Sequence, residues 1–182
     1  MKNFESLIRQ RRSIRKFTDE LLKPEEVEKI LKAALMAPSS KCKTPWEFVV
    51  VEDKETLKKL AGCKEHGAKF LEGCALAVVV LCNGMLTDAW IEDGAIAAIY
   101  MQLEAEDLGL GSCWCHIRNR QTADDTDSDN YIREMFGIPY QMDVLCVIGF
   151  GHKEQERMPF DAEKLQWEKV HIGQYPSLHE ED

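Results

Sequence analysis

The sequence contains no apolar run long enough to cross a bilayer. Its two longest apolar stretches, residues 75–82 and 94–101, are far shorter than the ~20 residues that a membrane helix needs. The N-terminus also lacks the uninterrupted apolar segment of an export signal. We therefore expect a cytoplasmic protein without a membrane partner.

The chain has no surplus of positive charge either. Its 182 residues include 23 Lys and Arg against 32 Asp and Glu, which gives a formal net charge of −9. Nucleic acid and anionic membranes both attract positive surfaces, so neither is expected as a general partner. Any anion-binding site must therefore be a local cluster of cations.

Nothing in the composition divides the chain into parts. There is no linker, internal repeat or low-complexity tract, and a chain of this length can bury its own core, so we expect one domain over residues 1–182. The seven cysteines are an odd number in a chain without an export signal. This pattern favours reduced thiols over a disulfide framework.

The hydrophobic pattern predicts helices between successive strands. Helices are predicted at residues 3–10, from 24 to a stop at Pro38, and at 54–60, 65–71, 87–108 and 131–136. Strands are predicted at residues 47–51, 75–82, 112–117 and 144–149. Because helices separate the strands, we expect a mixed sheet covered by helices rather than a chain of hairpins.

The helix over residues 87–108 is expected at the centre of the molecule. Its middle, residues 94–101, is apolar on every side, which is typical of a helix that is buried all round. Small residues such as Gly94 and Ala97 allow close backbone approach, including that of a second subunit. Gly109 is expected to end the helix, because glycine adopts the left-handed conformation without steric cost.

Positive charge is most concentrated after the first helix. Five of the 23 Lys and Arg lie in the run RQRRSIRK at residues 9–16. One interpretation is that these cations stabilise the C-terminal end of the helix and otherwise stay in water. The other is a phosphate clamp, in which Arg11, Arg12, Ser13 and Arg15 direct guanidinium groups and a hydroxyl at one anion. The cluster alone is compatible with both.

Two prolines frame a polar segment, residues 37–46, before the first strand. The segment either turns backbone groups toward a ligand or simply connects two elements. It contains Cys42 between Lys41 and Lys43, and neighbouring cations favour a reactive thiolate. A thiol-based redox sensor is therefore an alternative interpretation of the protein.

A second group of thiols lies in the strand at residues 112–117. Cys113, Cys115 and His116 suggest metal binding at first sight. In a strand, however, the two cysteines face one side and the histidine faces the other, which does not gather ligands around one ion. We therefore expect structural cysteines and no metal.

Taken together, these motifs resemble the nitroreductase family of FMN-dependent oxidoreductases. The resemblance rests on RRSIR at residues 11–15, APSS at 37–40 with Pro-Trp at 45–46, the helix at 90–110 running into Gly-Leu-Gly, and RMP at 157–159. Each motif is weak alone, but their order and spacing are specific. They favour the phosphate clamp over the alternative.

The family resemblance implies a fold and an assembly. It implies an α+β sandwich with a mixed, mainly antiparallel central sheet flanked by helices. It also implies a homodimer that binds two FMN molecules at the subunit interface. Residues 157–182 would form a C-terminal extension that packs on its own domain or on the partner subunit.

The resemblance also implies which residues hold FMN. Arg11, Ser13 and Arg15, with help from Arg12, would bind the phosphate, the ribityl chain and the pyrimidine edge of the flavin, and Arg157 would be a second phosphate ligand. Three loop residues of the partner subunit would line the flavin. The complete set of expected positions is Arg11, Arg12, Ser13, Arg15, Pro38, Ser39, Ser40, Cys42, Cys113, Trp114 and Arg157.

Three positions depart from the family's pattern. Many members carry Asn and Gln where this chain has Cys42 and Thr44, and a thiol forms weaker hydrogen bonds than an amide. A basic residue often lies two positions before the C-terminal arginine, where this chain has Gln155, and Lys153 or His152 would supply that charge. These differences bear on substrate preference and FMN affinity more than on the fold.

The implied activity needs no catalytic side chain. The flavin would take a hydride from NADH or NADPH and pass electrons to a nitroaromatic, quinone, enone or free flavin in a ping-pong cycle. Positive charge from Arg15 near the ring would stabilise the reduced flavin. A flavin-binding protein that lacks enzymatic activity is the other interpretation of the same fold.

Overall fold

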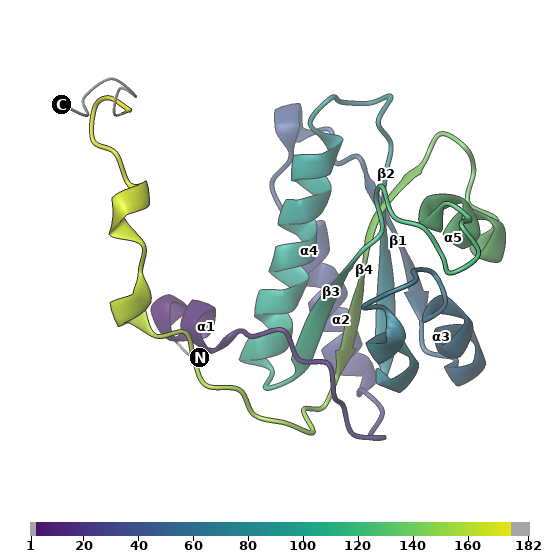
Figure 1. The fold of residues 1–182 in the computed structure, drawn as a ribbon, viewed down its shortest axis with the longest axis horizontal. Coiled ribbons are helices and arrows are strands. Elements are labelled where there is room, and N and C mark those ends of the chain that lie inside the picture. The colour runs from purple at the N-terminus through teal and green to yellow at the C-terminus, as the bar shows by residue number, and fades with distance from the viewer. Residues whose placement is uncertain (1–2, 176–182) are drawn as a thin grey trace.

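The protein is built around a four-stranded antiparallel sheet (Figure 1). The computed structural model describes residues 3–175. In spatial order the strands are β1 (Trp46–Val51), β2 (Leu76–Cys82), β4 (Asp143–Gly151) and β3 (Gly111–His116). Each neighbouring pair runs antiparallel, and β3 forms one edge of the sheet.

The expectation of a mixed sheet is wrong for these four strands. Within residues 3–175, parallel pairing is confined to an isolated bridge between Ser13 and Ser112. A helix between two strands is compatible with either direction, because the helix and its loops can return the chain to either end of the sheet. The finer expectation of a mainly antiparallel sheet is confirmed.

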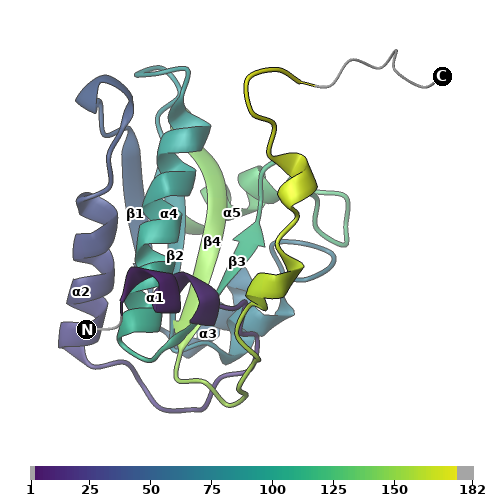
Figure 2. The ribbon, with the colours of Figure 1, turned by 90° about the vertical axis from the view of Figure 1, so that its left-hand side faces the viewer.

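Helices cover both faces of the sheet (Figure 2). The helices α2 (Pro24–Leu35) and α4 (Trp90–Asp107) lie on one face, and α3 (Lys54–Leu60) and α5 (Ser128–Phe136) lie on the other. The first helix, α1 (Phe4–Gln10), stands apart from the sheet beside α4. The helix predicted at residues 65–71 is wrong: a short 3-10 helix forms at Lys69–Gly73 instead.

The inner strand β2 shows why helices must cover both faces of the sheet. Val78 and Val80 belong to the core under α2 and α4, whereas Ala77 and Val79 belong to the core under α3 and α5. Burying a valine side chain contributes roughly 1.5–3 kcal/mol, so both cores depend on this strand. Its run of apolar residues without alternation is thus the signature of a strand buried on two sides.

Helix α4 is central, but it is not buried on every side. Ala97 and Met101 are fully buried against the sheet, while Ile99 and Tyr100 are 37% and 39% exposed. The predicted burial all round is therefore wrong for the single chain, and an apolar stripe remains uncovered. The predicted helix end is confirmed: Gly109 follows α4 with a left-handed φ of 81°.

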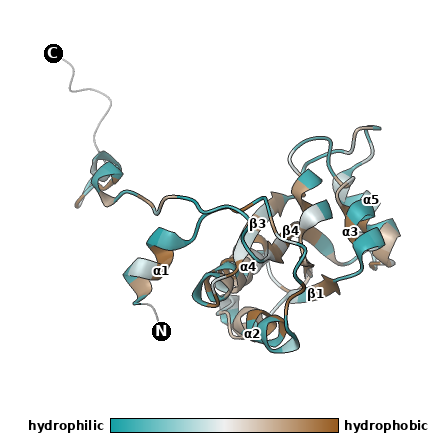
Figure 3. Cartoon of the chain, turned by 90° about the horizontal axis from the view of Figure 1, so that it is seen from below, coloured by the Kyte–Doolittle hydropathy of each residue, from teal (hydrophilic) through white to brown (hydrophobic). Residues whose placement is uncertain are grey.

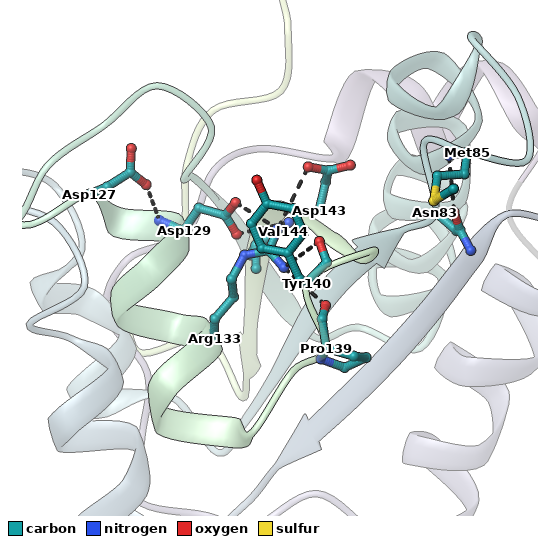
Figure 4. Close-up of polar contacts among 9 residues, drawn as sticks. All are labelled: Asn83, Met85, Asp127, Asp129, Arg133, Pro139, Tyr140, Asp143 and Val144. Atoms are coloured by element: carbon teal, nitrogen blue, oxygen red, sulfur yellow. Dashed lines mark hydrogen bonds and ion pairs between the residues drawn. The ribbon is translucent and has the colours of Figure 1, made fainter.

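Arg133 of α5 connects this helix, through hydrogen bonds and ion pairs, to the segment that leads into β4 (Figure 4). Its guanidinium contacts Asp129 at 3.0 Å and Asp143 at 3.6 Å, and it donates to the carbonyls of Pro139 and Tyr140 at 3.0 and 3.1 Å. The Arg133 side chain is only 11% exposed. Removing the mostly buried guanidinium would leave two neighbouring carboxylates without their cation, so the network connects these elements only as a complete set.

The chain after β4 leaves the sheet as an extended arm, which we define as residues 152–175. Figures 1 and 3 show the arm standing away from the body of the protein, on the side where α1 lies. The arm carries the exposed apolar side chains of Met158, Phe160, Leu165, Trp167, Val170, Ile172 and Tyr175. Residues 176–182 of the predicted C-terminal extension lie outside the described residues. No helix within residues 3–175 has the length and apolar character needed to span a membrane.

Candidate functional site

The segment at residues 11–15 is extended and held against the sheet edge. The amide of Ile14 donates to the carbonyl of Ser112 in β3 at 2.9 Å. The buried Ile14 side chain lies so close to β3 that a Cβ on Gly111 would be 2.8 Å from its Cγ2. Glycine at this position therefore permits the close approach of the basic segment to β3.

The other side of this segment is fixed by the chain that follows β4. Thr18 donates through its amide to the carbonyl of His152 at 3.0 Å, and Glu154 donates to the carbonyl of Lys16 at 3.2 Å. The basic segment and the residues after it are thus hydrogen-bonded to β3 and to the start of the arm. Backbone contacts of this kind fix the positions of the neighbouring arginines.

A cavity of about 350 Å³ opens beside this segment, and we call it the clamp cavity. Its lining consists of Ile8, Arg11, Arg12, Ser13, Arg15, Arg157 and Phe160. The structure therefore gathers five predicted site residues, four of them arginines, around one space. Such a set of guanidinium groups with a hydroxyl is suited to an anion with several oxygens.

The arm brings Arg157 to the clamp cavity. Arg12 donates through Nη1 to the carbonyl of Met158 at 2.9 Å, and Phe160 donates through its amide to the carbonyl of Arg9 at 2.8 Å. Arg9 also donates through Nε to the carbonyl of Phe160 at 3.3 Å. These bonds connect residues about 150 positions apart, which explains how one cavity combines both ends of the chain.

The two predicted site residues in β3 face opposite sides of the strand. Cys113 is buried beside the basic segment, and its thiol donates to the carbonyl of Trp114 at 3.6 Å. Burial raises the pKa of the Cys113 thiol, while the nearby charges of Arg15 and Arg11 act in the opposite direction. Trp114 faces the other side and stacks with His116 at a ring separation of 6.5 Å. Only Cys113 therefore lies next to the clamp residues.

The predicted site residues Pro38, Ser39, Ser40 and Cys42 do not line the clamp cavity within one chain. Their loop is held instead by Asp93 of α4, which accepts a hydrogen bond from the Ser40 amide at 2.8 Å. The loop includes non-glycine residues with left-handed φ, among them Cys42 at 52°. Backbone strain of this kind is maintained only by surrounding contacts, so the buried Asp93 carboxylate is one support of the loop's shape.

Lys153 and His152, which were expected to add positive charge to the site, contact carboxylates outside the clamp cavity. Lys153 donates through Nζ to both carboxylate oxygens of Glu106 at 2.9 Å, and their side chains are 13% and 5% exposed. His152 lies 3.7 Å from a carboxylate oxygen of Glu20. Sequence reasoning missed Glu106, because it lies among other acidic residues at the end of α4 and nothing in the sequence marks it as the buried one.

A second cationic cavity was also missed by the sequence reasoning. It has a volume of about 540 Å³ and lies where the loop after α3 meets the loop after β3. Its lining is Lys64, Glu65, His66, Asn119, Arg120, Gln121 and Asp127. The available signal was the RNR run at residues 118–120, directly after a predicted strand, but its partners lie some 55 residues earlier in the chain.

Known proteins are similar to this chain over most of its length. The model of the nitroreductase family matches residues 8–90 and 87–152. A provisional NADH dehydrogenase/NAD(P)H nitroreductase of Archaeoglobus fulgidus is 34% identical over 91% of this chain and 94% of its own length. An FMN reductase (NADPH) of Bacillus subtilis is 30% identical over 76% of this chain and 65% of its own length. The structure of an FMN-dependent nitroreductase from Clostridium difficile R20291 superposes with a TM-score of 0.92 at 43% identity, covering 94% of this chain and all of that one.

Proposed function

The chain belongs to the nitroreductase family, and from this premise we propose that it transfers reducing equivalents from NADH or NADPH to a small organic acceptor. It is an oxidoreductase and an FMN flavoprotein of this family. Nitroaromatics, quinones, enones and free flavin are the acceptor classes that the proposal includes. The observation that carries the assignment to this chain's own residues is the gathering of Arg11, Arg12, Ser13, Arg15 and Arg157 around one cavity.

The donors around the clamp cavity fit the phosphate of FMN. A phosphate dianion requires several charge-assisted donors, and the cavity offers four guanidinium groups and one hydroxyl. Within residues 3–175, no carboxylate lies within ion-pair distance of Arg11, Arg12, Arg15 or Arg157. On a chain with a net charge of −9, four neighbouring arginines that have no acidic partner within residues 3–175 are suited to binding an anion.

The residues around the site have distinct tasks in this proposal. FMN, when bound, supplies the hydride chemistry that protein side chains lack. Arg11, Arg12 and Arg157 hold the phosphate, while Ser13 and Arg15 orient the remainder of the flavin along β3. Arg15 adds fixed positive charge, which favours a negatively charged flavin ring. No side chain is assigned a proton transfer or a nucleophilic attack.

We infer that the chain works as a homodimer in which the arm packs on the partner subunit. A second chain would cover the uncovered stripe of α4 with Ile99 and Tyr100, and it would cover the arm, where Ile172 is 96% exposed. Exposed large apolar side chains that gather on one segment, as on the arm, are typical of an interaction site. In such a dimer, Pro38, Ser39, Ser40 and Cys42 of the partner subunit would complete the flavin site.

The thiol at Cys42 keeps a redox-sensor role as the second candidate function. Cys42 is exposed, whereas the other six cysteines are buried. Burial raises the pKa of both Cys74 and Cys82 to about 12, so these thiols stay protonated and unreactive at neutral pH. A Cys42→Ser variant with unchanged activity and an unchanged response to oxidant would remove this candidate.

Steady-state turnover separates the proposed enzyme from a binding protein. The protein loaded with FMN should oxidise NADH or NADPH in the presence of a quinone or a nitroaromatic compound. The matched control is free FMN at the same concentration. Turnover no faster than that of free FMN would contradict the proposed activity, even if the protein retained the flavin.

A further inference from the structure

The second cationic cavity, which we call the β3-end cavity, is formed by two loops that are bonded to each other. The amide of Glu65 donates to the carbonyl of Gln121 at 3.0 Å. The amide of Ser128 donates to the carbonyl of Arg120 at 2.9 Å, and Gln121 pairs with Asp127 as an isolated bridge. The cavity walls are therefore fixed by backbone hydrogen bonds, as in a preformed ligand site.

The acidic residues of this cavity have partners of their own. Glu65 lies 3.4 Å from the imidazole of His66, and Asp127 accepts a hydrogen bond from the Asp129 amide at 2.9 Å as the cap of α5. By contrast, in the part of the chain from 3 to 175, Lys64 and Arg120 form no ion pair with a carboxylate. Arg120 donates through Nη1 to the carbonyl of Asn119 at 2.7 Å. The cavity thus offers a ligand Lys64, the remaining guanidinium donors of Arg120 and two amide side chains.

His116, at the end of β3, lies near three cations. Its pKa is lowered first by burial and then by the positive charges of Arg120, Lys64 and Arg118. Three cations therefore act on one point although the whole chain is acidic. These three cations outnumber the carboxylates of Glu65 and Asp127 that line the cavity, so the local charge still favours an anion.

The β3-end cavity is separate from the clamp cavity. The basic segment contacts β3 at Ser112, whereas the cavity's β3-side loop begins after Ile117. Five residue steps along a strand correspond to about 16 Å, which is too far for one phosphate to reach both. The two cavities share no lining residue.

We propose that the β3-end cavity binds an oxyanion, a phosphate or a carboxylate, carried by one of the organic substrates of the reaction. Lys64 supplies a point charge, Arg120 supplies a planar fork of donors, and Asn119 and Gln121 supply amide donors. The identification of the ligand as a substrate rests on the proposed oxidoreductase function. The anion has two possible sources, the 2′-phosphate that distinguishes NADPH from NADH and an acidic group on the acceptor.

Binding of inorganic phosphate tests the cavity itself. The 15N-labelled full chain, saturated with FMN so that the clamp is filled, is titrated with phosphate and followed by NMR. Saturable shifts are expected at residues 64–66 and 119–121. They should be lost in Lys64→Gln/Arg120→Gln and retained in Lys29→Gln, which removes an exposed charge from α2. Absence of saturable shifts, or equal affinity in the double variant, would overturn the proposal.

The phosphate titration tests the cavity whether or not the proposed function is correct. If the chain does not retain FMN, the same titration is performed in Arg11→Ala, where the clamp is weakened, so the cavity is still tested. If the double variant does not fold, as judged by circular dichroism, Arg120→Gln and Arg120→Lys are compared instead. Loss of phosphate affinity in the first and partial recovery in the second are expected.

Substrate selectivity then identifies the source of the anion. Loss of one charge-assisted hydrogen bond weakens binding by about 10-fold or more. A fall of that size in the NADPH/NADH ratio of kcat/KM in the double variant assigns the phosphate of the dinucleotide. A similar fall in the ratio for 4-nitrobenzoate over nitrobenzene assigns an acidic acceptor. If neither ratio changes, the substrate assignment is overturned.

Discussion

The clamp cavity and the β3-end cavity collect positive charge on an acidic chain in different ways. The clamp draws Arg11, Arg12, Ser13 and Arg15 from one short extended segment and adds Arg157 from the arm. The β3-end cavity draws its cations from two loops that meet only in the folded structure. The first site depends on how one segment lies against β3, whereas the second depends on the packing of α3 and α5. Each site should therefore respond to a different structural change.

The largest effect is expected from removing two cations of the clamp. Arg11→Ala/Arg157→Ala should weaken FMN binding by about 100-fold or more, since a hydrogen bond to a charged group is worth roughly 1.5–3 kcal/mol. Fluorescence quenching of FMN gives the affinity. Lys29→Ala is the matched control, because it removes an exposed charge of α2 that does not line the cavity. Equal affinity in the double variant and the parent would exclude the clamp as the phosphate site.

The next prediction tests whether the β3-end cavity and the clamp depend on different packing contacts. Arg133→Ala should reduce the free energy of unfolding by about 3 kcal/mol, because it leaves the partly buried carboxylates of Asp129 and Asp143 unpaired. Urea unfolding measures the loss. Exchange of amide hydrogens should rise at residues 119–136 and not at residues 11–18. An equal rise in amide exchange in both regions would mean that the two sites depend on the same packing contacts.

A smaller effect is expected from moving the basic segment off β3. Gly111→Ala adds a Cβ that would lie 2.8 Å from Ile14. Overpacking of this kind costs about 1–3 kcal/mol and should also weaken FMN binding several-fold by displacing the clamp. Gly73→Ala is the control, because nothing lies within 4 Å of the added Cβ. Similar FMN affinities in both variants would show that contact with β3 does not position the clamp.

The smallest effect is a pH dependence of stability that follows from the burial of His116 and from the cations beside it. The pKa of His116 is lowered in the folded protein, so the unfolded chain binds the proton first as the pH falls. The stability is thus fully retained above the ordinary histidine pKa of about 6.5 and declines as the pH falls below it. The decline should be shallower in His116→Gln. Identical profiles for variant and parent in urea unfolding from pH 8 to pH 5 would contradict the lowered pKa of His116.

The sequence predicted what depends on neighbouring residues. The helices at Phe4–Gln10 and Lys54–Leu60, the strand after Trp46 and the end of α4 at Gly109 all follow local periodicity or cap chemistry. The basic run at residues 11–15 was visible for the same reason, because its members lie within five positions. Such features need no knowledge of which segments meet in space.

The sequence could not predict what depends on distant contacts. The strand order and the antiparallel pairing follow from long-range packing. The periodicity of a helix does not determine whether the next strand runs parallel or antiparallel to the previous one. The exposed stripe at Ile99 and Tyr100 looks like core in the sequence, because composition does not tell a buried face from an uncovered apolar one. Lys64 and Arg120 each look like ordinary surface charges until two loops bring them together.

The surface on which the arm packs could not be predicted from the sequence either. Its apolar residues predicted an ordered packing surface, but sequence alone left open whether the surface belongs to the same subunit or to the partner. Light scattering of the parent and of a chain that ends after Pro159 tests this proposal. A dimer that becomes a monomer on truncation is expected. A monomeric parent at micromolar concentration would contradict the inferred assembly.

The central claim is that the clamp holds a flavin that accepts reducing equivalents. The direct test is the visible absorption spectrum of the purified protein, supplied with FMN and desalted, before and after anaerobic addition of NADH or NADPH. A retained flavin spectrum that bleaches with either nucleotide is the predicted result. A protein that keeps no flavin, or keeps one that neither nucleotide bleaches, would contradict the account.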